Sequence, residues 1–150
     1  MAPSTDVLIG DAGAQYVLIR PIARSHPGLF DYWDGNWIDC DVEIAAGAFR
    51  GHFRAHMRAE EFAGFLTEVR ALSGTLEGAA TFNTMEGQLS VTLSGDGKGH
   101  VHVQGTAVDE PGTGNRLEFG FDIDQSYLHG IASCLDSFVA AFPVVNPTDA

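Results

Sequence analysis

The sequence has no apolar run that approaches the roughly 20 residues of a membrane-spanning helix, and it contains few cysteines and few basic residues. Its N-terminal stretch, MAPSTDVLIGDAG, has neither the basic segment nor the apolar segment of a secretory signal peptide. The G-x-S-x-G motif of serine hydrolases and the G-x-x-x-x-G-K-[ST] motif of phosphate-binding loops are also missing. These absences predict a cytoplasmic protein with no recognisable catalytic motif.

The two cysteines, Cys40 and Cys134, are too few to form a disulfide framework. Each lies at an apolar position of its local pattern, Cys40 between Ile38 and Val42, and Cys134 beside Leu135. This placement is typical of buried, unreactive thiols. A catalytic cysteine is the alternative interpretation.

Basic residues are scarce, since 20 acids oppose 8 lysines and arginines for a formal charge of −12. Residues 71–150 contain only two bases, Lys98 and Arg116. Such a charge repels nucleic-acid phosphates and anionic membranes and attracts basic proteins. We therefore expect no nucleic-acid or membrane partner, although the charge could also serve solubility alone.

Apolar and polar residues alternate along most of the chain, which indicates β-strands. Two segments, 58–74 and 124–143, instead have helical apolar spacing. The predicted strands are 5–10, 16–22, 37–45, 48–57, 76–83, 87–94, 99–108 and 115–123.

We expect one α+β domain over residues 1–150, with N-terminal strands and a loop in 1–36 and a loose tail at 143–150. Its fold is predicted as a single antiparallel sheet of about six to eight strands, with two helices packed on the apolar face. The helical residues expected to be buried there are Phe62, Phe65, Leu66, Ile131, Leu135 and Phe138.

The stretch WIDCDVEIAAGAFRGHFRAHMR (residues 37–58) places acids on one predicted strand and bases on the next. If Ala46 and Gly47 form the hairpin loop, every acid lies opposite a base on one face of the sheet. A structural role for these charges is then sufficient, and no catalytic residue is predicted among them. The expected pairs are Glu43 with Arg50, Asp41 with His52, and Asp39 with Arg54.

His100 and His102 lie two residues apart and therefore on one face of a strand. With His52 and His56 on the same sheet, and Glu118 or Asp122 nearby, they could form a metal- or ligand-binding face. However, no third ligand follows the pair at a local spacing. We therefore predict no metal, no cofactor and no catalytic site, and keep a small metal-dependent enzyme or ligand-binding β-domain as the alternative function.

The segments WIDCDVEI, GAFRGHF, EEFAGFL, LEGAATF, GKGHVHVQG and LEFGFDIDQSYL occur in succession over about residues 36–140. This succession resembles the WapI family of bacterial immunity proteins. The resemblance implies a cytoplasmic, non-enzymatic inhibitor that binds and neutralises the C-terminal toxin domain of a cognate secreted toxin. It assigns no partner-contacting residues.

The acidic, aromatic stretch DYWDGNWID provides the candidate partner-binding residues Asp31, Tyr32, Trp33 and Asp34. The two acids have no base nearby in the sequence, and Tyr and Trp are enriched in binding hot spots. We expect these residues to contact a basic cleft on the toxin domain. The alternative is that Trp33 and Trp37 cap the hydrophobic core.

Overall fold

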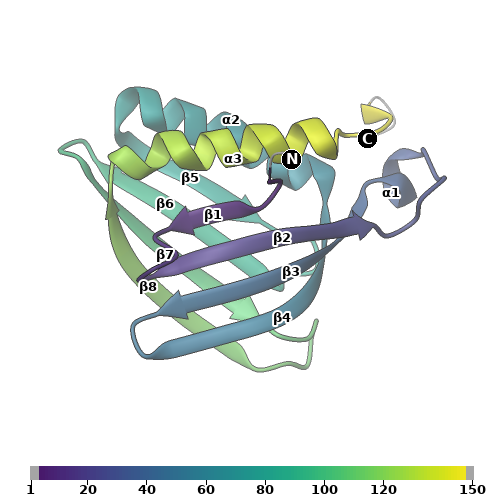
Figure 1. Ribbon diagram of the computed structural model, residues 1–150, viewed down its shortest axis with the longest axis horizontal. Coiled ribbons are helices and arrows are strands. Elements are labelled where there is room, and N and C mark those ends of the chain that lie inside the picture. The colour runs from purple at the N-terminus through teal and green to yellow at the C-terminus, as the bar shows by residue number, and fades with distance from the viewer. Residues whose placement is uncertain (1–3, 148–150) are drawn as a thin grey trace.

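The computed structural model of the protein describes residues 4–147 and contains two antiparallel sheets of four strands each. The first sheet has the order β1-β2-β3-β4, the second the order β5-β6-β7-β8, and a helix follows each sheet in the chain (Figure 1). A short helix, α1, interrupts the first sheet. The elements are β1 (Val7–Gly10), β2 (Tyr16–Arg24), α1 (Tyr32–Gly35), β3 (Trp37–Ala46), β4 (Phe49–Arg58), α2 (Ala59–Thr75), β5 (Glu77–Asn83), β6 (Leu89–Asp96), β7 (His100–Val108), β8 (Arg116–Asp124) and α3 (Ser126–Ala141).

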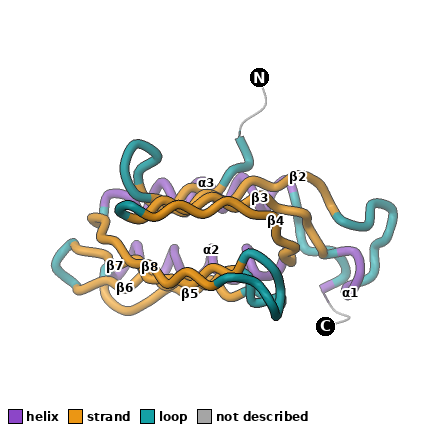
Figure 2. The backbone as a smooth tube through the Cα atoms, turned by 90° about the horizontal axis from the view of Figure 1, so that it is seen from below, coloured by secondary structure: helices purple, strands orange, loops and turns teal. Residues whose placement is uncertain are grey.

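The expected α+β class and the antiparallel pairing are confirmed, but the prediction of a single sheet is wrong. Figure 2 shows the two sheets as separate layers. The buried apolar side chains of both sheets belong to one core cluster. The strands β4 and β5, which α2 connects, belong to different sheets and do not pair. Alternation predicts which face of a strand is buried, but it does not predict which strands share a sheet.

The sequence suggested that both helices cover one face of a single sheet. In the structure they do not. Instead, α2 lies along β5, α3 lies along β1, and the two helices contact each other along one side of the molecule (Figure 1). Phe62 of α2 stacks on Phe138 of α3 with ring centroids 3.8 Å apart, and Phe82 of β5 packs against Phe62. All six helical residues expected in the core are buried. Among the helices of residues 4–147, none combines the length and the apolar character that crossing a membrane would require.

The β3–β4 hairpin has the predicted faces but a different register. Its turn is formed by Gly47 and Ala48, so Ala46 pairs with Phe49. Gly47 takes a φ of +59°, which suits the first position of a two-residue hairpin turn and favours glycine there. The predicted pairs are therefore wrong by two residues, and a shift of two leaves every side chain on its predicted face. The observed pairs are Glu43 with His52, Asp41 with Arg54, and Asp39 with His56.

The chain after α3 returns to the loop that contains α1. Val145 exchanges backbone hydrogen bonds with the buried Asn36 side chain, at 2.8 and 3.0 Å. Arg24 donates to the carbonyl oxygens of Gly35 and Pro143. The first residues of the predicted tail at 143–150 are thus held against the fold, and residues 148–150 lie outside the described part of the chain.

Candidate functional site

The loop between β2 and β3 carries exposed apolar side chains at the end of the molecule where α1 lies (Figure 1). Phe30 is 74% exposed and Trp33 is 57% exposed. Asp31 and Asp34 beside them are exposed as well, whereas Tyr32 is half-buried. We call this set the α1 surface, and it consists of Leu29, Phe30, Asp31, Trp33 and Asp34.

The α1 surface includes three of the four residues that the sequence suggested for partner binding and adds two that it missed. Leu29 and Phe30 were overlooked because they lie in the predicted loop, where no alternating pattern assigns a side chain to a face. The signal that could have revealed them is the apolar pair Leu29-Phe30 directly after Pro27-Gly28, where a loop is expected. Since Trp33 is exposed, it does not cap the core.

The short α1 helix has a defined backbone despite its length. Asp31 caps it, because its carboxylate accepts a hydrogen bond from the Asp34 backbone N–H at 2.9 Å. Gly35 allows a close approach at its end: a Cβ there would lie 2.7 Å from the Leu29 carbonyl oxygen and 2.9 Å from the Val145 side chain. The loop before α1 and the segment after α3 are therefore packed tightly around Gly35.

Arg58, the last residue of β4, binds the backbone of α1 through its buried side chain. Its side chain is 1% exposed and donates hydrogen bonds of 2.7 Å to the carbonyl oxygens of Tyr32 and Trp33. The guanidinium also lies over the rings of Tyr32, Trp33 and Trp37, at 4.9 to 5.5 Å from their centroids. The sequence placed Arg58 in an alternating row of exposed bases, so this role was not predicted.

Two glutamates at the start of α2 accept further hydrogen bonds around Arg58. Glu60 accepts hydrogen bonds from the Arg58 guanidinium and from the Tyr32 hydroxyl. Glu61 accepts backbone hydrogen bonds from Arg58 at 2.7 Å and from Met85 at 2.6 Å, which ties the helix start to the β5–β6 turn. Burial raises the pKa of Glu61 to about 7.

The four histidines of the alternative metal-binding face do not share a surface. His52 and His56 lie on the first sheet, and His100 and His102 lie on the second. Each contacts an aspartate: His52 with Asp41, His56 with Asp39, His100 with Asp96, and His102 with Asp122, at 2.7 to 3.1 Å.

The first sheet also brings Asp41, Glu43 and His52 within 4.8 Å of one another, a spacing that could admit a metal ion. However, both carboxylates already face arginines: Glu43 pairs with Arg20 at 3.1 Å, and Asp41 lies 3.7 Å from Arg54. These ion pairs lower the net negative charge available to a cation. The row of charges on β3 and β4 therefore acts chiefly as a cross-strand network.

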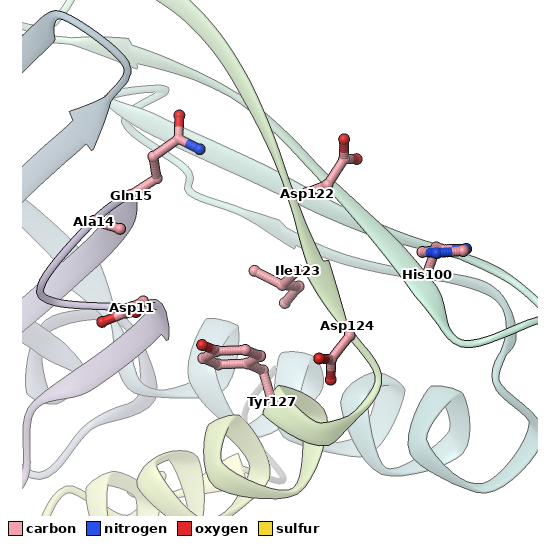
Figure 3. Close-up of a pocket in the computed structure, with 8 residues that line it drawn as sticks. All are labelled: Asp11, Ala14, Gln15, His100, Asp122, Ile123, Asp124 and Tyr127. Atoms are coloured by element: carbon pink, nitrogen blue, oxygen red, sulfur yellow. The ribbon is translucent and has the colours of Figure 1, made fainter.

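A shallow pocket of about 330 Å³ opens between the β1–β2 turn, the end of β8 and the start of α3 (Figure 3). Asp11 and Tyr127 line one side and Asp122 and His100 the other. The Asp124 carboxylate accepts hydrogen bonds from the hydroxyl and the backbone N–H of Ser126 at the start of α3. These hydrogen bonds lower the pKa of Asp124. The pocket is acidic and open.

Comparison with known proteins gives one family. The model of the "Immunity protein WapI-like family" matches residues 7–143. No curated protein matches the chain. Among solved structures, the chain is similar to one described as "Crystal structures of trypanosoma bruciei MRP1/MRP2", with 11% identity, a TM-score of 0.47, and coverage of 95% of this chain and 88% of that chain.

The family match covers nearly all of the chain and includes both sheets and both long helices. It confirms the resemblance that the sequence suggested, and it confirms the expectation of an immunity protein, which neutralises a toxin, over an enzyme. The chain belongs to the WapI-like family of immunity proteins.

Proposed function

We propose that the protein binds the C-terminal toxin domain of a cognate secreted toxin in the cytoplasm, and that the α1 surface makes the central contact. The observation that carries this proposal is the exposure of Phe30 and Trp33 on a backbone fixed by a buried arginine. Most large apolar side chains of the chain are buried, so an exposed aromatic pair is informative. Large aromatic residues commonly dominate the energy of protein–protein binding.

The anchored backbone favours tight binding. A loop that is already ordered loses little conformational entropy when a partner binds it, and the affinity rises accordingly. Here the Tyr32 and Trp33 carbonyls, the Gly35 contact and the Asn36 side chain all fix the loop before binding. The α1 surface is thus preorganised for a partner.

The charge supports a basic partner. Asp31 and Asp34 form no ion pair with any residue in the described range 4–147, and the whole chain carries a charge of −12. Such a surface steers a basic cleft toward it and raises the association rate. The same charge disfavours nucleic acid and anionic membranes as partners.

The test is co-expression of the protein with the toxin domain encoded beside its gene. We expect rescue of growth, co-purification of the two chains, and an association rate that falls as salt rises from 50 to 500 mM in the assay, since salt screens exposed charges. A toxin domain that kills cells despite the protein, and that does not co-purify with it, would contradict the proposal.

A further inference from the structure

A groove runs between β1 and α3, away from the α1 surface. Two adjoining cavities of about 470 and 510 Å³ form it, and they share Leu8, Gly130 and Cys134 in their walls. Figure 1 shows β1 lying directly beside α3 along this side of the molecule. We call this feature the β1–α3 groove, lined centrally by Leu8, Leu18, Gly130, Ser133, Cys134 and Ser137.

The β1–β2 wall of the groove carries apolar side chains, and the α3 wall carries small residues. Leu8 pairs with Leu18 across β1 and β2, and both side chains point away from the core, where Val7 and Ile9 are buried. On α3, Gly130 leaves open space, because a Cβ added there would meet no atom within 4 Å. A partner backbone or a chain of apolar side chains can therefore approach α3 closely.

The rim of the groove is acidic. Asp6 and Asp11 line the cavities, and no lysine or arginine does. Arg20, which lies 3.5 Å from Asp6, also pairs with Glu43 at 3.1 Å, so it faces two carboxylates. A second copy of this chain would bring acidic rims together and would be repelled. An apolar segment flanked by lysines or arginines fits both the walls and the rim.

We propose that the β1–α3 groove receives such an apolar, basic-flanked segment of the toxin domain, as a contact additional to the α1 surface. This inference rests on the proposed function, because it takes the toxin domain as the occupant. The groove contact differs from the α1 contact in its location. The groove is built by β1 and α3, whereas the α1 surface is built by the β2–β3 loop.

The chain provides its own reporter for the groove. Cys134 lines both cavities and is partly exposed, while Cys40 is fully buried and its pKa is raised by that burial. A maleimide reagent should therefore modify one thiol in the folded free protein, at Cys134, as located by mass spectrometry. In the complex with the toxin domain we expect the labelling rate to fall at least about tenfold, and Cys134→Ser should remove the label.

Matched glycine variants test the groove independently. Gly130 on α3 and Gly64 on α2 are both exposed helical glycines at which a Cβ would meet no atom within 4 Å. Gly130→Lys fills the groove and places a positive charge there, while Gly64→Lys makes the same change on the other helix. We expect Gly130→Lys to weaken toxin binding at least about tenfold and Gly64→Lys to leave it unchanged.

The outcomes separate this inference from the proposed function. A complex that forms while Cys134 stays fully reactive, or that tolerates Gly130→Lys as well as Gly64→Lys, overturns the groove contact and leaves the proposed function standing. Protection of Cys134 in the protein alone, increasing with its concentration, assigns the groove to self-association and also overturns it. Failure of the unmodified protein to bind the toxin domain overturns both.

Discussion

The carbonyl oxygen of Trp33 accepts a hydrogen bond of 2.7 Å from the guanidinium of Arg58, which is 1% exposed. A buried arginine therefore supports the backbone beneath an exposed tryptophan. The same guanidinium donates to Tyr32 and to Glu60, so one side chain connects the α1 loop, the end of β4 and the start of α2. The order of the exposed surface depends on this contact.

Arg58→Met should destabilise the protein by about 3 kcal/mol, because it removes the buried cation that pairs with Glu60 and the hydrogen bonds from the guanidinium to the Tyr32 and Trp33 carbonyls. Urea unfolding measures this change. The matched control is Arg70→Met, which removes an exposed ion pair to Asp136 and should cost less than about 1 kcal/mol. Equal losses for the two variants would show that Arg58 is not a structural anchor.

Glu61 should make the folded state less stable as the pH rises from about 5 to about 8. Its pKa in the folded protein is raised to about 7 by burial, above the ordinary value of 4.5, so the folded state binds the proton more tightly than the unfolded state. Deprotonation through this window therefore reduces the free energy of unfolding, by on the order of 2 kcal/mol.

Glu61→Gln isolates the effect of this group, because glutamine has the same shape and does not titrate. The free energy of unfolding of the variant, measured in urea at several pH values, should fall less between pH 5 and pH 8 than that of the unmodified protein. If both proteins show the same pH dependence, the carboxyl of Glu61 does not titrate in this range.

Phe138→Ala should cost about 3–5 kcal/mol, because it removes a fully buried ring from the contact between the two long helices. Phe49→Ala is the matched control, since Phe49 is 66% exposed near the β3–β4 turn and should change stability by less than about 0.5 kcal/mol. Thermal unfolding of the unmodified protein and of the two variants measures both changes in stability. A small loss for Phe138→Ala would mean that α3 is not part of the cooperative core.

Trp33→Ala and Phe30→Ala should each weaken binding of the toxin domain by about 10- to 100-fold, as expected of aromatic hot spots. Both side chains are mostly exposed, so the stability of the protein should change little. Isothermal titration calorimetry gives the affinities, and Phe49→Ala again serves as the exposed aromatic control. If all three variants bind equally well, the partner contacts a different surface.

The sequence predicted a large part of the candidate site but not its support. The acidic, aromatic stretch around Asp31 and Trp33 was visible because its residues break the alternation of the flanking strands. Their role in partner binding stays a prediction. Arg58 was not visible, because a charged residue in an alternating row is normally solvated, and only the folded chain places rings and carbonyls around it.

The sequence by itself determined most of the apolar core, because the period of the apolar pattern assigns each side chain to a face of its strand or helix. All eight strands and both long helices follow from that pattern. The register of paired strands and the choice of partner strands did not follow from this period. Gly47 fixed the β3–β4 turn one residue later than predicted, so every pair moved by two residues without a side chain changing face.

Only the tertiary structure decided that eight strands form two sheets. Alternation is a local property, whereas the choice of sheet depends on where α2 carries the chain between β4 and β5. The same holds for the contact between Asn36 and Val145, which are far apart in the sequence and meet because α3 returns the chain to α1. Long-range contacts of this kind leave no periodic signal, so the sequence specifies them only through the packing of the whole molecule.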